Sequence, residues 1–310
     1  MKIAVWGAGE IGRGVAYRLV TTVFTSELHW INRSYQKIEH RVVDLEHGLD
    51  FAPSCRSVTA HSEEKAARAL DGAGILVLTL GAAVKEGQSR ADLYPENRKL
   101  FDESVIPALA GFGGVVLVVT NPVDLMARWV QRQSGFSSER VLGLGTVVET
   151  ARLRASLGSY LSPLRPAREV WAYAVGTHDE RFVPVAMPGL GFGAGSMPEG
   201  EMDEVLDNAR REVISGARRV KSDQRSTLHP IVEAVVKVAE SIALDRQATL
   251  TVSVLDPDSP EGLYYSVPCT VGKGGVVHRH VGVLSQPKVK SQMASCCDGL
   301  RDTLRSAGEA

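Results

Sequence analysis

A glycine-spaced turn directly after the first strand-like run is the feature that constrains this chain most. The apolar run Ile3–Val5 is closely followed by a G-x-G-x-x-G pattern. Its glycines are Gly7, Gly9 and Gly12. In a strand, turn and helix of this kind, the first glycine permits the tight turn, the second lets the backbone approach a pyrophosphate, and the third lets helix and strand lie close together. The phosphates lie against the N–H groups and positive end of the following helix, here expected near Glu10, so the sequence predicts a dinucleotide-binding unit.

The residues about 20 positions after the turn bear on which nicotinamide cofactor is bound. Asn32, Arg33 and Ser34 stand where an acidic side chain would bind both hydroxyls of the adenosine ribose. An aspartate would repel a 2′-phosphate, whereas an amide beside a guanidinium and a hydroxyl accommodates one through charge-assisted hydrogen bonds. We therefore expect NADP. The alternative is NAD, with Asn32 bound to the ribose hydroxyls and Arg33 as a solvated surface residue.

The first half of the chain alternates apolar runs with helix-like segments. The runs Ile3–Val5, Ile75–Leu80 and Val115–Thr120 show no alternation of polar residues, which is typical of strands buried on both faces of a parallel sheet. The segments Ile11–Val20 and Leu93–Leu109 suit the helices of right-handed crossovers. The expected fold class is α/β, with an N-terminal Rossmann domain built on a doubly wound parallel sheet.

The second half mixes helices and short strands and predicts a C-terminal α+β catalytic domain. The expected elements are a helix from Glu149, strands at 170–175 and 183–187, helices at 202–220 and 227–243, a strand pair at 250–254 and 262–268, and a helix ending near Ser306. We place the boundary after Thr146, which gives a dinucleotide-binding domain at 1–146 and a substrate domain at 147–310.

The composition of the chain argues against nucleic acid and membrane partners. The 35 basic and 36 acidic side chains leave a net charge of −1, which offers no field for nucleic acid or anionic lipid. No apolar stretch approaches the roughly 20 residues that cross a bilayer, and no signal peptide precedes the first strand, so we expect a cytoplasmic protein. The four cysteines have no metal-ligand spacing, and we expect reduced thiols and no metal.

Beyond the first turn, successive segments resemble the lactate and malate dehydrogenase family, in order along nearly the whole chain. These segments are D-L-E-H-G at 44–48, G-A-A-V-K-E-G-Q-S-R at 81–90, N-P-V-D at 121–124, the stretch 145–154, G-T-H at 176–178 and the stretch 264–275. The resemblance implies an NAD(P)-dependent 2-hydroxy acid dehydrogenase with a 2-oxo acid substrate. It also implies a homodimer or homotetramer.

The resemblance implies catalytic roles for three residues. His178 matches the catalytic histidine, whose ordinary pKa near neutrality suits it to give a proton in reduction and take one in oxidation. Glu149 stands where the family has an aspartate that orients this histidine. Arg90, on the loop that begins at Gly81, would close over the substrate, exclude water and stabilise negative charge on the carbonyl oxygen.

The same resemblance implies the binding residues. Arg152 would grip the substrate carboxylate through a planar two-point contact, for which a guanidinium suits better than an ammonium. Asn121 would bond the substrate carbonyl oxygen, and Thr227 would line the carboxylate side of the pocket. The expected cofactor-binding residues are Gly7, Gly9, Glu10, Ile11, Gly12, Asn32, Arg33, Ser34, Gly81, Thr120 and Asn121.

Several positions depart from the family pattern. The extra methylene of Glu149 moves its carboxylate by roughly 1.5 Å, and a misplacement of that size can cost about a hundredfold in rate. Asp179 follows the histidine where the family has glycine, and the K-G-x-T signature is replaced by Q-R-S-T at 224–227. Val84 stands where malate enzymes have arginine and lactate enzymes glutamine. Because valine cannot pair with a second carboxylate, we expect a substrate with an apolar or bulky side chain rather than a dicarboxylate.

Three functional hypotheses remain open at this point. The leading one is a 2-oxo acid reductase. A second keeps the cofactor and replaces the ketone by an imine adjacent to a carboxylate, which the same arginine and acid could serve. A third treats Glu149 and Asp179 as signs of lost chemistry and leaves a catalytically silent nucleotide-binding module. Structural roles also compete with catalysis, since Arg152 could form a helix-face salt bridge with Glu149 and His178 could be a surface or core residue.

Overall fold

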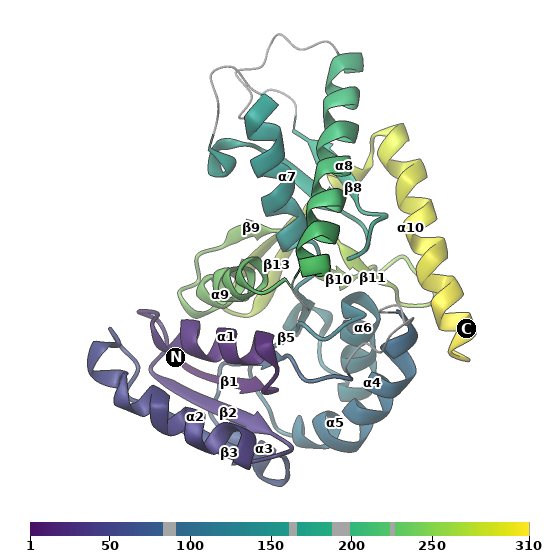
Figure 1. The fold of residues 1–310 in the computed structure, drawn as a ribbon. Coiled ribbons are helices and arrows are strands. Elements are labelled where there is room, and N and C mark those ends of the chain that lie inside the picture. Colours follow the sequence, from purple (N-terminus) through teal and green to yellow (C-terminus); the bar gives the residue numbers. More distant parts are fainter. Residues whose placement is uncertain (83–90, 161–165, 188–198, 224–226, 310) are drawn as a thin grey trace.

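The computed structural model describes residues 1–82, 91–160, 166–187, 199–223 and 227–309 (Figure 1). Its centre is a sheet of eight strands in the order β11-β10-β6-β5-β4-β1-β2-β3. The parallel part consists of β1 (Lys2–Trp6), β2 (Glu27–Asn32), β3 (Ser57–Ser62), β4 (Ile75–Leu78), β5 (Val115–Val118) and β6 (Val141–Gly143). The chain order reverses between β1 and β4. These two strands pair with each other, and the sheet continues from β1 to β2 and β3 on one side and from β4 to β5 and β6 on the other. Ligands of such sheets bind beyond the carboxyl ends of the strands at this switch point.

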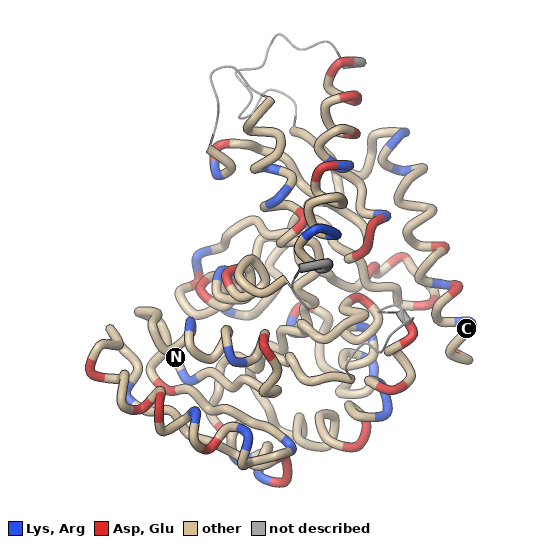
Figure 2. The backbone as a smooth tube through the Cα atoms, viewed as in Figure 1, with Lys and Arg blue, Asp and Glu red and all other residues tan. Residues whose placement is uncertain are grey.

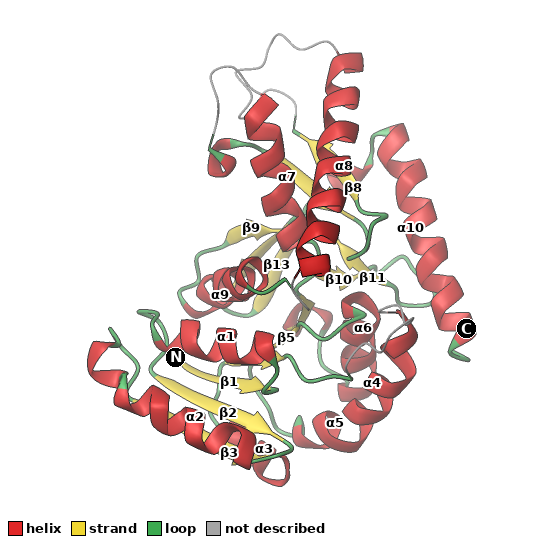
Figure 3. Cartoon of the chain, viewed as in Figure 1, coloured by secondary structure: helices red, strands yellow, loops and turns green. Residues whose placement is uncertain are grey.

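Helices cover both faces of this sheet (Figures 1 and 3). They are α1 (Glu10–Val20), α2 (Gln36–His47), α3 (Ala66–Leu70), α4 (Tyr94–Leu100), α5 (Ile106–Ala108) and α6 (Val123–Ser134). Helix α1 contacts α9 on one face, and α5 contacts α3 and α6 on the other. The four residues of β4 and of β5 are fully buried, as expected for strands covered on both sides. The predicted Rossmann domain is confirmed.

The second half forms a mixed α/β unit beside this sheet. Its elements are α7 (Val147–Tyr160), β7 (Ala172–Val175), β8 (Val183–Ala186), α8 (Glu199–Asp223), α9 (His229–Ala243), β9 (Ala248–Leu250), β10 (Ser253–Leu255), β11 (Tyr264–Ser266), β12 (Cys269–Gly272), β13 (Gly275–Arg279) and α10 (Pro287–Ser306). Strands β7 and β8 form an antiparallel pair, and β13, β12 and β9 form a three-stranded antiparallel sheet. Between α7, β7 and α8 lies a separate apolar core that includes Leu153, Leu157 and Val213.

Two elements differ from the sequence prediction. The expected strand at 250–254 is divided into β9 and β10, because the carbonyl of Thr251 accepts a hydrogen bond from the Thr146 backbone and its hydroxyl bonds that of Thr150. Strands β10 and β11 then join the edge of the large sheet through β6. Helix α9 begins at His229 rather than Thr227, with Pro230 in its first turn, where proline is well tolerated. The junction between the two halves is therefore tied together by strand pairing.

The charged side chains are interspersed over the molecule. Figure 2 shows basic and acidic residues mixed along the helices and loops, without a long run of one sign. None of the described helices is long and apolar enough to span a membrane. In the described part of the chain, no group of three or more histidine, cysteine or acidic residues gathers as a metal site. The four cysteines are all free thiols.

Candidate active site

The glycine turn between β1 and α1 has the geometry that the sequence pattern requires. Gly7 has a φ of +124°, which side-chain-bearing residues rarely adopt. A Cβ atom on Gly12 would lie 2.2 Å from the carbonyl oxygen of Gly7, so only glycine lets the helix approach the turn this closely. The indole N–H of Trp30, on β2, donates a 2.8 Å hydrogen bond to the same carbonyl. The turn is therefore fixed from both of its neighbouring elements.

A pocket along the carboxyl ends of β1 and β2 fits the adenosine half of a nicotinamide dinucleotide. A Cβ on Gly9 would meet no protein atom within 4 Å, so contacts within the chain do not explain this glycine, whereas close approach of a ligand does. The pocket is lined by six of the expected residues together with others that include Lys37 and Glu63. The expected ones are Gly7, Gly9, Asn32, Arg33, Ser34 and Gly81. The side-chain amide of Asn32 donates to the carbonyl of Ser34 and shapes this loop.

A neighbouring pocket continues along the ends of β4 and β5. It contains the expected Ile11, Gly81, Thr120 and Asn121. The buried Asn97, on α4, holds two of its walls together, because its amide oxygen accepts from the Ala82 backbone at 2.7 Å and its amide nitrogen donates to the Asn121 carbonyl at 2.6 Å. Asn121 therefore lies with the residues expected to bind the cofactor and does not line the pocket that contains Arg152. No motif in the sequence marks Asn97.

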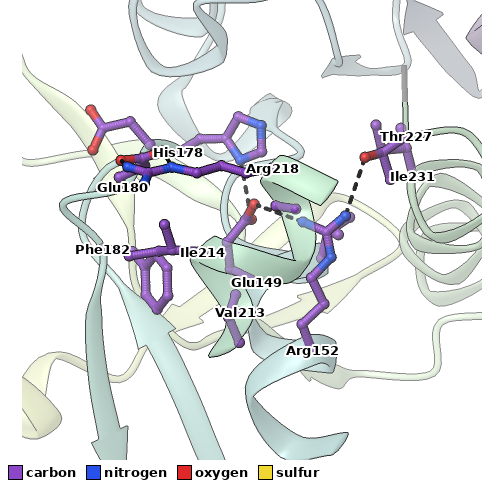
Figure 4. Close-up of a pocket in the computed structure, with 13 residues that line it drawn as sticks. Glu149, Arg152, His178, Glu180, Phe182, Val213, Ile214, Arg218, Thr227 and Ile231 are labelled. Carbon is purple, nitrogen blue, oxygen red and sulfur yellow. Dashed lines mark hydrogen bonds and ion pairs between the residues drawn. The ribbon is translucent and has the colours of Figure 1, made fainter. Parts of the chain in front are cut away.

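A third pocket brings together four residues from three separate segments. Glu149 and Arg152 come from the first turns of α7, His178 from the loop between β7 and β8, and Thr227 from just before α9. Figure 4 shows Glu149 between His178 and Arg152, with Thr227 beyond the arginine. Glu149 Oε2 lies 3.1 Å from His178 Nδ1, and Glu149 Oε1 lies 4.0 Å from Arg152 Nη1. Arg152 Nη2 donates to Thr227 Oγ1 at 3.3 Å.

The electrostatics of this pocket keep Glu149 ionised. Burial by itself raises the pKa of its carboxyl, but the charge and hydrogen bond of His178 and the nearby Arg152 guanidinium bring the pKa below its ordinary value. The Glu149 and His178 side chains are only 12% and 14% exposed, so water screens their interaction little. A carboxylate at Nδ1 fixes the ring orientation and leaves Nε2 to act on a ligand.

The main chain of His178 is held by residues that the sequence analysis did not assign. The backbone N–H of His178 donates at 3.0 Å to a carboxylate oxygen of Asp124, the last residue of N-P-V-D. Burial raises the pKa of Asp124 to about 6. Two residues before the histidine, Gly176 exchanges a pair of backbone hydrogen bonds with Ser266 on β11, at 2.8 and 2.7 Å. The loop that carries His178 is thus anchored to α6 and to the edge of the large sheet.

Two family models together match nearly the whole chain. The model described as "lactate/malate dehydrogenase, NAD binding domain" matches residues 1–143, and "lactate/malate dehydrogenase, alpha/beta C-terminal domain" matches residues 146–310. The chain belongs to the lactate/malate dehydrogenase family. The resemblance recognised in the sequence is therefore confirmed, and with it a dehydrogenase with a nicotinamide cofactor.

Relatives in the lactate/malate dehydrogenase family carry the name L-lactate dehydrogenase. The chain is 29% identical to one from Clostridium botulinum over 99% of its own length and 96% of the relative's. It is 30% identical to one from Shouchella clausii over 89% of its length and 85% of the relative's. A solved lactate dehydrogenase from a Medee basin deep-sea metagenome library superposes with a TM-score of 0.86 at 30% identity, covering 98% of both chains. A minor L-lactate dehydrogenase from Enterococcus mundtii shares the fold at 24% identity, with a TM-score of 0.85 and 98% of both chains covered.

Some of the expected site residues do not line any of these three pockets in the described part of the chain. Val84 and Arg90 fall outside the described residues, and Glu10 forms the first residue of α1. Asp179, where the family has glycine, accepts hydrogen bonds from the Thr177 hydroxyl at 2.9 Å and from the Arg181 backbone at 2.7 Å. Its carboxylate is therefore engaged by its own loop.

The rest of the lining of the third pocket went unnoticed in the sequence. It combines apolar side chains with one pair of opposite charges, Glu180 and Arg218. The apolar residues are Val148, Phe182, Val213, Ile214, Ala217 and Ile231. Many of them come from the middle and C-terminal part of α8, which no motif marks. Sequence spacing could not place them, because the contacts join α8 to segments some 30 to 65 residues earlier.

Proposed function

We propose that this protein reduces a 2-oxo acid to a 2-hydroxy acid with NADP(H) as cofactor, on a substrate whose side chain carries no second carboxylate. The observation that carries the proposal is the contact of Glu149 with both His178 and Arg152 in one pocket. Such a constellation provides an anion-binding guanidinium and an oriented proton donor. Arg152 contacts Glu149 in a salt bridge and also bonds Thr227. These two contacts do not use all the N–H groups of the planar guanidinium, so donors remain for a substrate carboxylate.

The chain's own residues then have distinct tasks in the reaction. Arg152 holds the substrate carboxylate, which fixes the 2-oxo carbon relative to the neighbouring pocket of Asn121 and Thr120. His178 Nε2 gives a proton to the carbonyl oxygen, and Glu149 stabilises the charged ring before that transfer. When bound, the nicotinamide supplies the hydride. Arg90 and Val84 complete the proposal as the loop residues that close over the carbonyl oxygen and contact the substrate side chain.

The preference for NADP has support from the charges in the adenosine pocket. Arg33 and Lys37 bring two positive charges to the pocket, against the single carboxylate of Glu63. Lys37, in the first turn of α2 and four residues after Arg33, was not foreseen from the sequence. A 2′-phosphate would meet these cations and the hydroxyl of Ser34, which together resemble sites that bind phosphate by charge-assisted hydrogen bonds. Position 32 carries an amide where an acidic side chain would hold the free pair of ribose hydroxyls of NAD.

The preference for a monocarboxylate has support from the apolar wall. Phe182, Ile214 and Ala217 would leave a second carboxylate without a hydrogen-bonding partner over much of the pocket surface. Branched and aromatic 2-oxo acids would instead bury apolar area there.

Initial rates of the full chain with NADPH and with NADH, on a panel of 2-oxo acids and cyclic imine carboxylates, test the proposal. We expect turnover of branched or aromatic 2-oxo acids, with a higher kcat/KM for NADPH. Equal or better turnover of oxaloacetate would contradict the substrate assignment, and turnover of imines alone would replace the ketone by an imine. Cofactor binding without any turnover would leave a silent nucleotide-binding module. Light scattering of the same sample tests the homodimer or homotetramer that the family implies.

A further inference from the structure

A solvent-exposed ion pair forms part of the lining of the proposed substrate pocket, away from Arg152. Glu180, two residues after the catalytic histidine, accepts a 2.9 Å hydrogen bond from Arg218 Nε on α8, and Arg218 Nη2 donates to the other carboxylate oxygen. Both residues line the same pocket as Glu149, Arg152 and His178. In Figure 4, Arg218 and Glu180 lie on the His178 side, whereas Arg152 and Thr227 lie on the opposite side. The pocket therefore contains a second guanidinium in addition to the proposed carboxylate anchor.

The backbone around Glu180 fixes the place of this pair. Arg210, two turns earlier on α8, donates a 2.9 Å hydrogen bond from Nε to the Phe182 carbonyl and another from Nη2 to the Glu180 carbonyl. Its guanidinium also lies over the Phe182 ring, 5.6 Å from the centroid. The same helix thus holds the Glu180 loop through one arginine and pairs with its side chain through another. The two-point contact uses the Nε and Nη2 edge of Arg218, which is the edge that binds a carboxylate in a planar fork.

We propose that Glu180 makes the pocket selective against dicarboxylates by occupying Arg218. A second carboxylate on the substrate would reach a guanidinium whose carboxylate-binding edge is already filled, and it would lie beside the like charge of Glu180. A side chain without charge pays no such penalty and lies against Phe182, Ile214 and Ala217. This inference rests on the proposed function of the pocket, and it is independent of Val84, on which the expectation from the sequence depended.

Glu180→Gln is the variant that tests this selectivity. The amide keeps the shape of the side chain but removes its charge, which leaves Arg218 as an uncompensated cation toward the pocket. The substrates are oxaloacetate and 4-methyl-2-oxopentanoate, which differ by exchange of the distal carboxylate for an isopropyl group of similar shape. Because both side chains of the pair are more than half exposed, water screens the new contact, and we expect the ratio of kcat/KM for oxaloacetate over 4-methyl-2-oxopentanoate to rise about threefold. The rise should come mainly through KM for oxaloacetate, because the new contact is present before the transition state.

Two control variants separate Arg218 from a general charge effect. Glu204→Gln makes the same change at an exposed position of α8 that does not line the pocket, and we expect the wild-type ratio. The double variant Glu180→Gln with Arg218→Gln removes the cation as well, and we expect the ratio to return to the wild-type value. Thermal unfolding and NADPH binding of each variant confirm that the fold and the cofactor site are intact.

The outcomes distinguish this inference from the proposed function. If the wild type reduces 4-methyl-2-oxopentanoate but Glu180→Gln leaves the ratio unchanged, the inference fails and the proposed function stands. The inference also fails if the double variant shows the same rise as Glu180→Gln, because Arg218 is then not the group that binds the second carboxylate. If the wild type binds NADPH and turns over neither substrate, the proposed function fails and the inference fails with it.

Discussion

Shortening Glu149 to aspartate tests the geometry of the proton donor. Glu149 Oε2 lies 3.1 Å from His178 Nδ1, at the outer limit of direct hydrogen bonding. Removal of one methylene withdraws the carboxylate by roughly 1.5 Å, which places the two atoms more than about 4 Å apart unless the backbone moves. The contact with Arg152, already 4.0 Å long, is lost in the same step. Glu149→Asp therefore restores the residue type common in the family and should nevertheless impair this enzyme.

We expect kcat/KM of Glu149→Asp for a branched 2-oxo acid to fall about a hundredfold, the usual cost of misplacing a catalytic group by an ångström or more. Glu149→Gln keeps the length and removes the charge, so it reports separately on stabilisation of the protonated ring. Glu169→Asp, at an exposed position outside the pocket, makes the same chemical change as a control and should retain wild-type rates. Activity of Glu149→Asp within twofold of wild type, or above it, would refute the reasoning, because the side-chain length would then not set the position of the ring.

Two further predictions concern the buried carboxylate behind the histidine and the cofactor. Because burial raises the pKa of Asp124 to about 6 from an ordinary value of 3.8, the folded protein binds this proton more tightly than the unfolded chain, and stability attributable to the group falls as pH rises from about 4 to 7. The free energy of unfolding of wild type relative to Asp124→Asn should therefore decrease over that range by up to about 3 kcal/mol in urea titrations, whereas a pH-independent difference would contradict the cause assigned here. Arg33→Glu should lower kcat/KM for NADPH about tenfold or more and spare NADH, and equal losses with both cofactors would show that Arg33 does not contact the 2′-phosphate.

The parts of the fold that depend on local pattern could be predicted from the sequence. The turn needs a positive φ at Gly7 and close approach of the helix at Gly12, and glycine at these two neighbouring positions meets both requirements. Strands β4 and β5 are continuous apolar runs because helices cover both of their faces. The edge strands β10 and β11 could not be assigned to the large sheet, because β10 pairs with β6 next to contacts that Thr251 makes with Thr146 and Thr150, a hundred or so residues earlier, and β11 joins only through β10.

The candidate site likewise contains residues that the sequence predicts and contacts that it does not. His178, Arg152 and Glu149 stand in segments that match the family in order, and the structure brings them into one pocket. The pair of Arg218 with Glu180 joins a helix and a loop 38 residues apart, and nothing in the spacing of either predicts the contact. Asp124 lay inside a recognised motif, but its bond to the His178 backbone is a product of how α6 packs under the loop.

The kcat/KM for NADPH-dependent reduction of 4-methyl-2-oxopentanoate, compared between wild type and Arg152→Lys, tests the central claim most directly. Lysine keeps the positive charge but cannot make the planar two-point contact with a carboxylate. The account predicts measurable turnover by wild type and a loss of about a hundredfold in Arg152→Lys, the cost of a lost pair of hydrogen bonds to a charged group. No turnover by wild type, or rates in Arg152→Lys equal to those of wild type, would contradict the claim that Arg152 anchors a 2-oxo acid in this pocket.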